Sequence, residues 1–175
     1  NTVSNLSSTR ALRDVTNIHN RQYQASAVGE VNVVEKMKAC NAIIGGEGNG
    51  GIIYPELHYG RDALIGVALF LTQLAERKIS AKTLRDSFPN YFISKNKMEL
   101  TPEIDVDAIL STLEQKYKDE QITTIDGLKI DFEDGWVHLR RSNTEPIIRI
   151  YAESDTEEKA NAFAHKMIQE IKELL

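Results

Sequence analysis

The sequence predicts two small domains in series. The first is an α/β layer domain with a mixed sheet flanked by helices, and the second is an α+β domain with an antiparallel sheet packed on helices. Apolar runs and helical patterns alternate along residues 1–90, whereas residues 101–175 hold one helical pattern, three strand-like runs and a closing helix. A more polar stretch containing Pro89 and Pro102 lies between the two halves, and we assign residues 91–100 to a linker.

The clearest secondary-structure patterns of the expected first domain are two strands around a glycine-rich loop and a helix that follows them. NAIIGG (residues 41–46) predicts a short strand that stops on glycines, and GIIYPE (residues 51–56) predicts a second strand. Asp62 precedes the pattern ALIGVALFLTQLAERK and is expected to cap a helix there. Because this helix is apolar on most of its circumference, we expect it to be central to its domain. Nearer the N-terminus, an earlier helix is expected, with Ser7, Ser8 or Thr9 as its N-cap.

The expected second domain begins and ends with a helix. VDAILSTLEQKYK, which starts at Val106, has its apolar residues at helical spacing. TIDGLKIDF, WVHLR and IIRIYAES then predict three strands joined by turns. The last helix is amphipathic, and Ser154 with Glu157 is expected to form its capping box.

The composition narrows the classes of partner. The chain of 175 residues is 41% hydrophobic and 27% charged, as in ordinary globular proteins. Its formal net charge of −5 argues against a nucleic-acid partner or an anionic membrane surface. The single cysteine, Cys40, excludes an internal disulfide and fits a reducing cytoplasm, where we expect the protein to act. The longest apolar run, in the helix from Ala63, is too short to span a bilayer.

Three arginines gather around the loop RRSNTEP (residues 140–146). Residues 101–175 contain nine Lys and Arg against seventeen Asp and Glu, so this half is net −8. Its only arginines are nevertheless Arg140, Arg141 and Arg149. Cations concentrated in an acidic half indicate an anion site. The alternative is a hairpin whose arginines pair with nearby Asp and Glu side chains.

The donor groups of this loop favour phosphate. A guanidinium donates two parallel hydrogen bonds to phosphate or carboxylate. Ser142 and Thr144 add hydroxyl donors, and Asn143 adds an amide. A tetrahedral dianion with many acceptor lone pairs matches this set best. His138 lies two positions before Arg140 and is expected to share its face of the strand, but we interpret a lone strand histidine as structural.

Five glycines occur in the seven residues from Gly45 to Gly51, directly after a predicted strand. The loop is not a P-loop, because it lacks a Gly-Lys-Ser/Thr ending. It also lacks the dinucleotide-binding pattern, because a strand-like run follows it in place of a helix. It displays Glu47 and Asn49 from a bare backbone, and a carboxylate suits a pair of neighbouring hydroxyls, as on a sugar ring. The alternative is an ordinary surface turn.

A second polar cluster follows this loop. Glu56, His58, Arg61 and Asp62 lie within seven residues, but their spacing does not fit a metal site such as two histidines at i and i+4. We expect capping and local ion pairing here.

Taken together, GEGNG (residues 46–50) and RRSNTEP, about ninety residues apart, resemble two loops of the α-D-phosphohexomutase family. The first is similar to its sugar-binding loop, commonly Gly-Glu-x-Ser-Gly. The second is similar to its phosphate-binding loop, Arg-x-Ser-Asn/Gly-Thr-Glu-Pro. The surrounding stretches NAIIGGEGNGGIIYPELHYGRDALIG and IIRIYAES also resemble the family, so the likeness covers nearly the whole chain.

The resemblance implies that this chain is the C-terminal part of a four-domain enzyme. Residues 1–90 would form most of the third domain and residues 101–175 the fourth. The family's phosphoserine loop, a Ser-His-Asn-Pro-like stretch, and its metal loop, Asp-x-Asp-x-Asp-Arg, do not occur in this sequence. The resemblance therefore implies no catalytic residue in this chain, no metal site of its own, and Mg²⁺ bound by the N-terminal domains. We expect this part alone to be inactive.

The resemblance also assigns the site residue by residue. Three positions depart from the family's usual residues: Asn49 stands where Ser is common, Gly51 where some branches have His, and Arg141 where Pro is frequent. Gly29-Glu30 lies where a Gly-His pair occurs in some members, and Glu30, with Arg141, is a possible further contact. The implied sugar-binding residues are Gly46, Glu47, Gly48, Asn49 and Gly50, and the implied phosphate-binding residues are Arg140, Ser142, Asn143 and Thr144.

The implied activity is that of an isomerase. It would interconvert hexose 1-phosphate and hexose 6-phosphate through a phosphoserine and a bisphosphorylated sugar. The form of the sugar loop favours a phosphoglucosamine mutase, with phosphoglucomutase or phosphomannomutase kept open. The implied partners are the phosphosugar and the N-terminal domains of the same enzyme. A non-catalytic phosphosugar-binding module is the alternative.

Overall fold

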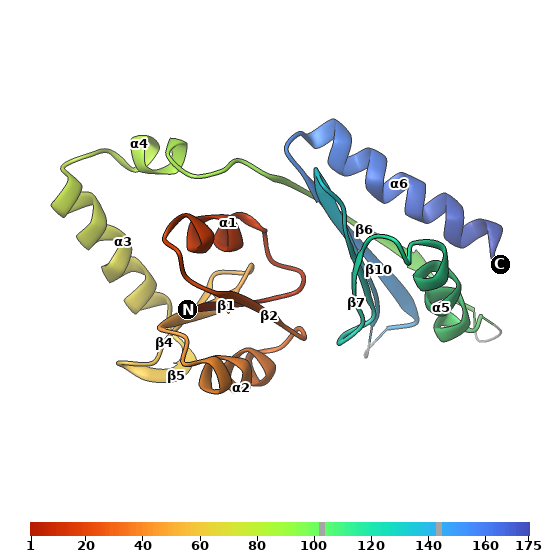
Figure 1. The fold of residues 1–175 in the computed structure, drawn as a ribbon, viewed down its shortest axis with the longest axis horizontal. Coiled ribbons are helices and arrows are strands. Elements are labelled where there is room, and N and C mark those ends of the chain that lie inside the picture. The colour runs from red at the N-terminus through yellow and green to blue at the C-terminus, as the bar shows by residue number, and fades with distance from the viewer. Residues whose placement is uncertain (102–103, 143–144) are drawn as a thin grey trace. The chain divides into compact units, whose positions relative to one another are not determined.

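The computed structural model describes residues 1–101, 104–142 and 145–175. The chain folds into two compact units, Asn1–Asn90 and Tyr91–Leu175 (Figure 1). Each unit is built around one five-stranded sheet. None of the helices in the described part of the chain is both long and apolar enough to cross a membrane.

The first unit contains a mixed sheet with strand order β2-β1-β3-β4-β5. The first three strands in that order run parallel, and the last two continue the sheet with antiparallel pairing. This confirms the predicted α/β class. The elements are β1 (Thr2–Asn5), α1 (Ala11–Ile18), β2 (Tyr23–Ser26), α2 (Glu30–Cys40), β3 (Ile44–Glu47), β4 (Gly51–Tyr54), β5 (His58–Arg61), α3 (Ala63–Arg77) and α4 (Ala81–Asp86).

Helices α1 and α2 lie on opposite faces of this sheet (Figure 1). On one face, the hydroxyls of Thr2 and Thr16 are 2.7 Å apart, which links β1 to α1. On the other face, Val3 is fully buried with Val33 and Met37 of α2. Because successive side chains of β1 point to opposite faces of the sheet, this strand contacts α1 on one face and α2 on the other.

Helix α3 differs from the sequence prediction in one respect. Asp62 caps it as expected, because its carboxylate accepts hydrogen bonds from the amides of Leu64 and Ile65. None of the residues of α3, all of which the structure describes, is buried, and Leu64 is 80% exposed. The helix lies against β4, where the Gly66 backbone approaches Ile52, and Ile65 and Leu69 are partly buried. Val67, Phe70 and Leu71 are exposed. The prediction of a central helix was therefore wrong for this unit.

The second unit contains an antiparallel sheet with strand order β6-β10-β9-β8-β7. Residues 91–100, which the sequence analysis assigns to a linker, contain its edge strand β6. On one side of the strand Met98 packs on the core and the Ser94 hydroxyl donates to the Asn161 side chain at 2.6 Å. Lys95 and Lys97 on the other side are exposed, as is typical of an edge strand. The elements are β6 (Phe92–Glu99), α5 (Val106–Lys116), β7 (Gln121–Thr123), β8 (Leu128–Asp131), β9 (Gly135–Arg141), β10 (Ile147–Ser154) and α6 (Glu157–Glu173).

One face of this sheet packs on α5 and α6. The core joins apolar residues of the two helices to alternate residues of β8, β9 and β10, such as Leu139 and Ile150. The other face therefore carries Trp136, His138 and Arg140, which alternate with the core residues of β9.

The predicted capping box of α6 does not form. Thr156 is the N-cap, and its hydroxyl accepts a hydrogen bond from the Lys159 amide at 3.2 Å. Ser154 is the last residue of β10, and its hydroxyl donates to the Asp134 carbonyl at 2.7 Å. Strand β10 ends at Ser154, as the run IIRIYAES predicts, and α6 begins at Glu157, so Thr156 and not Ser154 takes the capping position.

Candidate functional site

The predicted sugar loop is the turn of a hairpin. Strands β3 and β4 pair Glu47 with Gly51, and the Gly50 amide donates to the Glu47 carbonyl at 3.2 Å. Gly50 has φ +93°, a conformation that few other residues adopt. A Cβ on Gly46 would lie 2.2 Å from the Gly51 carbonyl oxygen, so the close pairing of the two strands requires glycine there. Much of the glycine content is thus explained by the hairpin itself.

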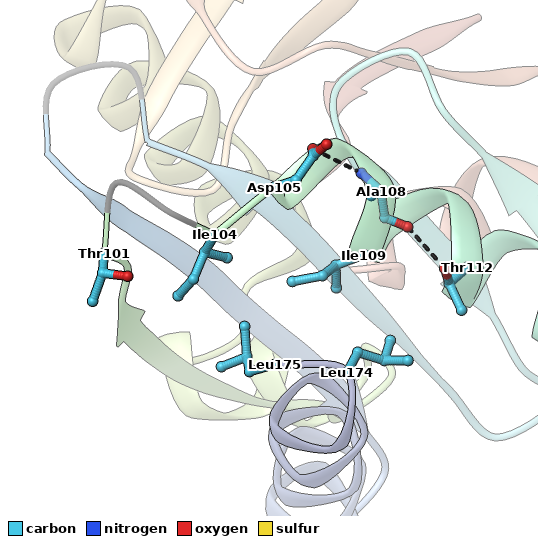
Figure 2. A pocket seen from close by; sticks show the side chains of 8 residues that line it. All are labelled: Thr101, Ile104, Asp105, Ala108, Ile109, Thr112, Leu174 and Leu175. Carbon is cyan, nitrogen blue, oxygen red and sulfur yellow. Dashed lines mark hydrogen bonds between the residues drawn. The ribbon is translucent and has the colours of Figure 1, made fainter.

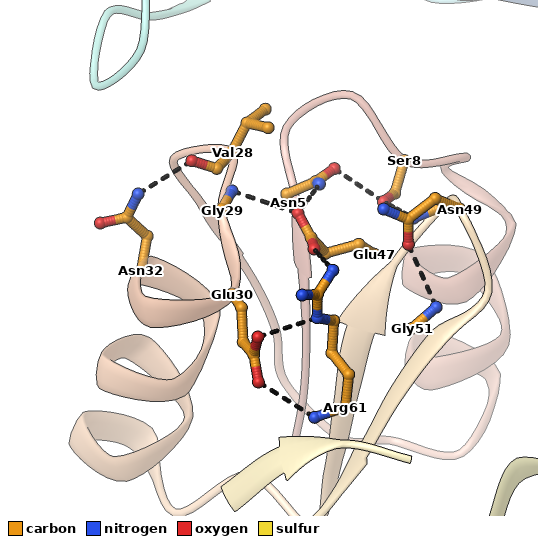
Figure 3. Close-up of polar contacts among 11 residues, drawn as sticks. Asn5, Ser8, Val28, Gly29, Glu30, Asn32, Glu47, Asn49, Gly51 and Arg61 are labelled. Carbon is orange, nitrogen blue, oxygen red and sulfur yellow. Dashed lines mark hydrogen bonds and ion pairs between the residues drawn. The ribbon is translucent and has the colours of Figure 1, made fainter. Parts of the chain in front are cut away.

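The Glu47 carboxylate is held in place by its surroundings (Figure 3). Its Oε1 accepts hydrogen bonds from the side-chain Nδ2 of Asn5 at 2.9 Å and from the backbone amide of Gly29 at 3.1 Å. The side chain is only 6% exposed. These two neighbours come from the carboxyl ends of β1 and β2, which lie beside the end of β3 because the three strands are parallel. The carboxylate is therefore fixed before any ligand binds.

Two further residues support the loop, and the sequence analysis missed both roles. Asn5 and Ser8 are each 5% exposed. The Ser8 hydroxyl donates to Asn5 Oδ1 at 2.8 Å and accepts from the Gly48 amide at 2.9 Å. None of the three expected hydroxyl residues is the N-cap of α1, which is Arg10, although the Thr9 hydroxyl accepts a hydrogen bond from the Ala11 amide at 3.2 Å. A polar side chain directly after the first strand was the available signal.

Asn49 lies at the exposed tip of the loop. Its side-chain oxygen accepts a hydrogen bond from the Gly51 amide at 3.1 Å. This bond closes the turn on itself. The Nδ2 group of Asn49 remains as a donor.

Glu30 lies close to Glu47, and Arg61 connects the two (Figure 3). Arg61 Nε donates to Glu30 Oε2 at 2.8 Å, and its backbone amide donates to Glu30 Oε1 at 3.1 Å. Arg61 Nη1 lies 3.7 Å from Glu47 Oε2. The hydrogen bond from the Arg61 backbone, with the charge of its side chain, lowers the pKa of Glu30 below its ordinary value. The structure thus brings together Glu30 and Glu47, which the sequence analysis treated separately.

The local ion pairing expected after this loop is present. His58 Nε2 lies 3.2 Å from Asp62 Oδ2. The amide of Ile65, followed by the contact with His58, lowers the pKa of the Asp62 carboxyl. Asp62 therefore acts as the cap of α3, and His58 pairs with it at the surface.

Arg140, the first arginine of the predicted phosphate loop, is paired with Asp126. Its Nε donates to the Asp126 carboxylate at 2.9 Å, and the two side chains are 21% and 20% exposed. Among the contacts of the described residues, this pairing occupies only the Nε edge of the guanidinium. The terminal nitrogens keep their donors for an anion.

Asp126 is also bound by His138. The histidine is 1% exposed, and its Nε2 lies 2.7 Å from the Asp126 carbonyl oxygen. Burial, together with the nearby Lys129 and Arg140 charges, lowers the pKa of His138 to about 4. The ring is therefore neutral near pH 7, and its Nε2–H donates to the carbonyl. The interpretation of His138 as structural fits this geometry.

The rest of this loop is described in part. Arg149 pairs with Glu145 at 3.1 Å, as the alternative reading of a self-paired hairpin expects. Arg141 is exposed and has no ion pair with a described residue. Ser142 is 7% exposed, and its amide donates to the Ile147 carbonyl at 2.9 Å. The predicted phosphate ligands Asn143 and Thr144 lie outside the described residues.

A cavity of about 470 Å³ occurs in the second unit (Figure 2). Two of its polar groups bond to the backbone of α5: the Asp105 carboxylate accepts from the Ala108 amide, and the Thr112 hydroxyl donates to the Ala108 carbonyl. Neither predicted loop lines it, so it is not part of the candidate site. It is lined by Thr101, Ile104, Asp105, Ala108, Ile109, Thr112, Leu174 and Leu175.

The fold and the two loops can be compared with known proteins. Residues 1–91 match the family model "Phosphoglucomutase/phosphomannomutase, alpha/beta/alpha domain III", and residues 96–170 match "Phosphoglucomutase/phosphomannomutase, C-terminal domain". The chain is 35% identical to a phosphoglucosamine/phosphogalactosamine mutase of Sulfurisphaera tokodaii and 34% identical to a phosphoglucomutase/phosphomannomutase of Thermococcus kodakarensis. Each alignment covers 99% of this chain and 38% of the relative. The chain therefore belongs to the phosphoglucomutase/phosphomannomutase family, as the two loops predicted.

Solved structures agree on the fold. A phosphoglucomutase/phosphomannomutase family protein from Burkholderia thailandensis matches with a TM-score of 0.79 and 22% identity, over 98% of this chain and 37% of that chain. N-acetylphosphoglucosamine mutase from Aspergillus fumigatus matches with a TM-score of 0.66 and 13% identity, over 97% of this chain and 41% of that chain. The chain thus spans less than half the length of these proteins.

Proposed function

We propose that this chain is the sugar- and phosphate-binding part of a phosphohexomutase, an isomerase that interconverts hexose 1-phosphate and hexose 6-phosphate. The observation that carries the proposal is the fixed carboxylate of Glu47, which is held by Asn5 and Gly29 with one oxygen left for a ligand. The names of the relatives, which include phosphoglucosamine mutases and phosphoglucomutase/phosphomannomutases, support the same class. A cytoplasmic location is part of the proposal.

In this proposal, the hairpin of β3 and β4 binds sugar hydroxyls. Glu47 Oε2 is the acceptor, because Oε1 already accepts two hydrogen bonds. The amide of Asn49 supplies a donor beside it in place of the hydroxyl of serine. The glycines from Gly46 to Gly50 keep the backbone free of side chains, so that a sugar ring can approach closely.

The loop between β9 and β10 binds the phosphate that is not reacting. Arg140 presents its terminal nitrogens, and a pair of parallel N–H donors fits a phosphate. Ser142, Asn143 and Thr144 complete the proposed set, with Arg141 as a further cation at the rim. Binding energy gained at this remote phosphate positions the reacting end of the sugar.

The proposed reaction needs groups outside this sequence. A phosphoserine transfers its phosphate to the free end of the phosphosugar, the bisphosphorylated sugar reorients, and its other phosphate returns to the serine. The proposed Mg²⁺ would be bound by N-terminal domains. The described residues contain no group of three or more His, Cys, Asp or Glu side chains placed to bind a metal ion. Without those domains, this chain alone is expected to be inactive.

Among the possible substrates, we favour a glucosamine phosphate. The sugar loop and the first relatives support this choice, although glucose and mannose phosphates fit the same acceptor. A non-catalytic phosphosugar-binding module is the second candidate, and it would use both loops in the same way.

A titration tests the proposal. The 175-residue chain is titrated with glucosamine 6-phosphate, glucose 1-phosphate, mannose 1-phosphate and inorganic phosphate, and amide shifts are followed by NMR. We expect every ligand to shift amides near Arg140 and Ser142, and the sugars alone to shift Glu47 and Asn49. An absence of shifts in both loops would contradict the proposal. Turnover by the isolated chain would contradict the assignment of catalysis to other domains.

A further inference from the structure

We propose that Arg61 is a sugar-binding residue, and that its guanidinium and the Glu47 carboxylate together hold one hydroxyl group of the substrate. This inference rests on the proposed function of the glycine hairpin. It adds a cation to a loop whose predicted binding residues are Glu47, Asn49 and backbone. Four structural observations carry it.

The first observation is that the glycine at position 51 makes room for Arg61. A Cβ on Gly51 would lie 2.7 Å from Arg61 Cδ and 3.1 Å from Arg61 Cγ. These atoms belong to the middle of the arginine stem, which a side chain at position 51 would displace. The stem therefore occupies the space directly above the hairpin, beside the residue that pairs with Glu47.

The second observation is that Arg61 is oriented by Glu30. The same carboxylate accepts from Arg61 Nε at 2.8 Å and from the Arg61 backbone amide at 3.1 Å. Glu30 is the first residue of α2, where the helix dipole favours a negative charge. Its carboxylate fixes both the start and the end of the arginine side chain, so the guanidinium has little freedom left.

The third observation is that two consecutive residues, Gly29 and Glu30, bond to Glu47 and to Arg61 respectively. The Gly29 amide donates to Glu47 Oε1 at 3.1 Å, while the next residue, Glu30, binds Arg61. Gly29 has φ +121°, which other residues rarely adopt. One turn at the start of α2 therefore sets the positions of the acceptor and of the donor.

The fourth observation is the spacing between these groups. Arg61 Nη1 and Glu47 Oε2 are 3.7 Å apart, which is too long for a direct hydrogen bond. An oxygen atom that lies to one side of the line joining them can be about 2.8 Å from both and bridge the two groups. Glu47 is 6% exposed and Arg61 is 49% exposed, so a ligand that reaches the carboxylate also meets the guanidinium.

The chemistry of this gap selects a hydroxyl. A hydroxyl donates its proton to Glu47 and accepts a hydrogen bond from Arg61 at the same oxygen. An ether oxygen has no proton to donate, and an ammonium group has no lone pair to accept. The pair thus recognises a sugar hydroxyl more selectively than the carboxylate alone.

The test combines a protein change with a ligand change. Arg61→Met keeps an unbranched stem beside Gly51 and removes the guanidinium, and Arg77→Met, at the exposed end of α3, is the matched control. Both variants and the parent chain are titrated by NMR with glucose 6-phosphate and with its 3-deoxy and 4-deoxy analogues. We expect Arg61→Met to weaken binding at Glu47 and Gly48 roughly tenfold, as for loss of a charged hydrogen bond, and Arg77→Met to have no effect.

The deoxy analogues identify the hydroxyl. One of them is expected to bind the parent chain roughly tenfold more weakly than glucose 6-phosphate, and this difference should be smaller for Arg61→Met, in which only Glu47 contacts the hydroxyl. Gly51→Ala should reproduce the loss without a change at Arg61, because its Cβ displaces the stem. In all variants, unchanged amide shifts of Gly29 and Asn5 in the free protein report that the hairpin is intact.

Two results would overturn the inference, and they are distinguishable. If the parent chain binds phosphosugars at the hairpin and Arg61→Met binds them equally well, Arg61 only bridges Glu30 to the sheet. If no phosphosugar shifts the hairpin of the parent chain, the proposed function of this loop fails, and the inference fails with it.

Discussion

Arg140 Nε donates a hydrogen bond to the Asp126 carboxylate at 2.9 Å, in a pair that is about one-fifth exposed on each side. The pair limits the rotation of the guanidinium and leaves its terminal nitrogens outside this contact. His138 holds Asp126 through the carbonyl, so the neutral ring on β9 orients the arginine two residues further along the same strand. An arginine oriented in advance loses less conformational entropy when it binds an anion.

Arg140→Ala should therefore weaken the binding of inorganic phosphate and of phosphosugars by at least about tenfold, because a charged donor pair is lost. Lys172→Ala is the matched control, because Lys172 is an exposed cation near the end of α6, which packs on the sheet face opposite to Arg140. Lys129 is unsuitable as a control, since it is 6% exposed and its Nζ lies 4.4 Å from the centre of the Trp136 ring. Equal losses for Arg140→Ala and Lys172→Ala, measured by NMR titration at constant salt, would indicate general charge attraction.

The free energy of unfolding of the second unit should decrease as the pH is lowered from about 6.5 to about 4. The pKa of His138 is lowered to about 4 in the folded chain, chiefly by burial, against an ordinary value of 6.5. Below pH 6.5 the unfolded chain binds a proton that the folded chain does not, so the free energy of unfolding decreases as the pH falls through this window. The shift corresponds to roughly 3 kcal/mol when complete.

Urea unfolding followed by the fluorescence of Trp136, the single tryptophan, measures this loss at pH 7 and pH 4.5. His138→Gln keeps a side-chain donor and should flatten that part of the pH profile. A histidine ring resonance of His138 that titrates near pH 6.5 in the folded protein would refute the explanation.

Gly127→Ala should destabilise the second unit by about 2 kcal/mol or more. Gly127 has φ +73°, and a Cβ there would lie 2.2 Å from the Leu139 carbonyl oxygen, so strain and a backbone clash add together. Gly50→Ala, at φ +93° in the sugar loop, has no atom within 4 Å of the added Cβ and should cost only about 1 kcal/mol in its own unit. Hydrogen exchange of each unit separates the two effects, and a larger cost for Gly50→Ala would contradict the role assigned to the clash.

Much of the fold could be predicted because its signals are local. The strands around the two loops, the cap by Asp62 and the helix that starts at Val106 follow from apolar spacing and capping chemistry within a few residues. Strand β6 was missed, because an edge strand with lysines on one side resembles a polar linker. The burial of α3 was overestimated, because apolar composition does not say which element covers a helix.

The two loops could be found in the sequence, but their supports could not. Asn5 and Glu47 are 42 residues apart, and only the parallel pairing of β1 with β3 brings them together. Arg61 approaches Glu47 because β4 and β5 return the chain to the same edge of the sheet. Polar residues that follow parallel strands are the usable signal for such supports, since the carboxyl ends of these strands meet at one edge.

Ser8→Ala tests how far the sugar loop depends on these supports. The change removes the hydroxyl that bonds to both the Gly48 amide and the Asn5 side-chain oxygen. Because Ser8 and Asn5 are each only 5% exposed, this loss should lower the free energy of unfolding by about 1–3 kcal/mol. The Gly48 amide should then exchange faster with solvent, and sugar-dependent shifts at Glu47 should weaken while phosphate-dependent shifts near Arg140 persist. Thr72→Ala on the exposed surface of α3 is the control. If Ser8→Ala leaves both exchange at Gly48 and sugar binding unchanged, the glycine hairpin is ordered by its own backbone, and the bonds to Ser8 and Asn5 do not position Glu47.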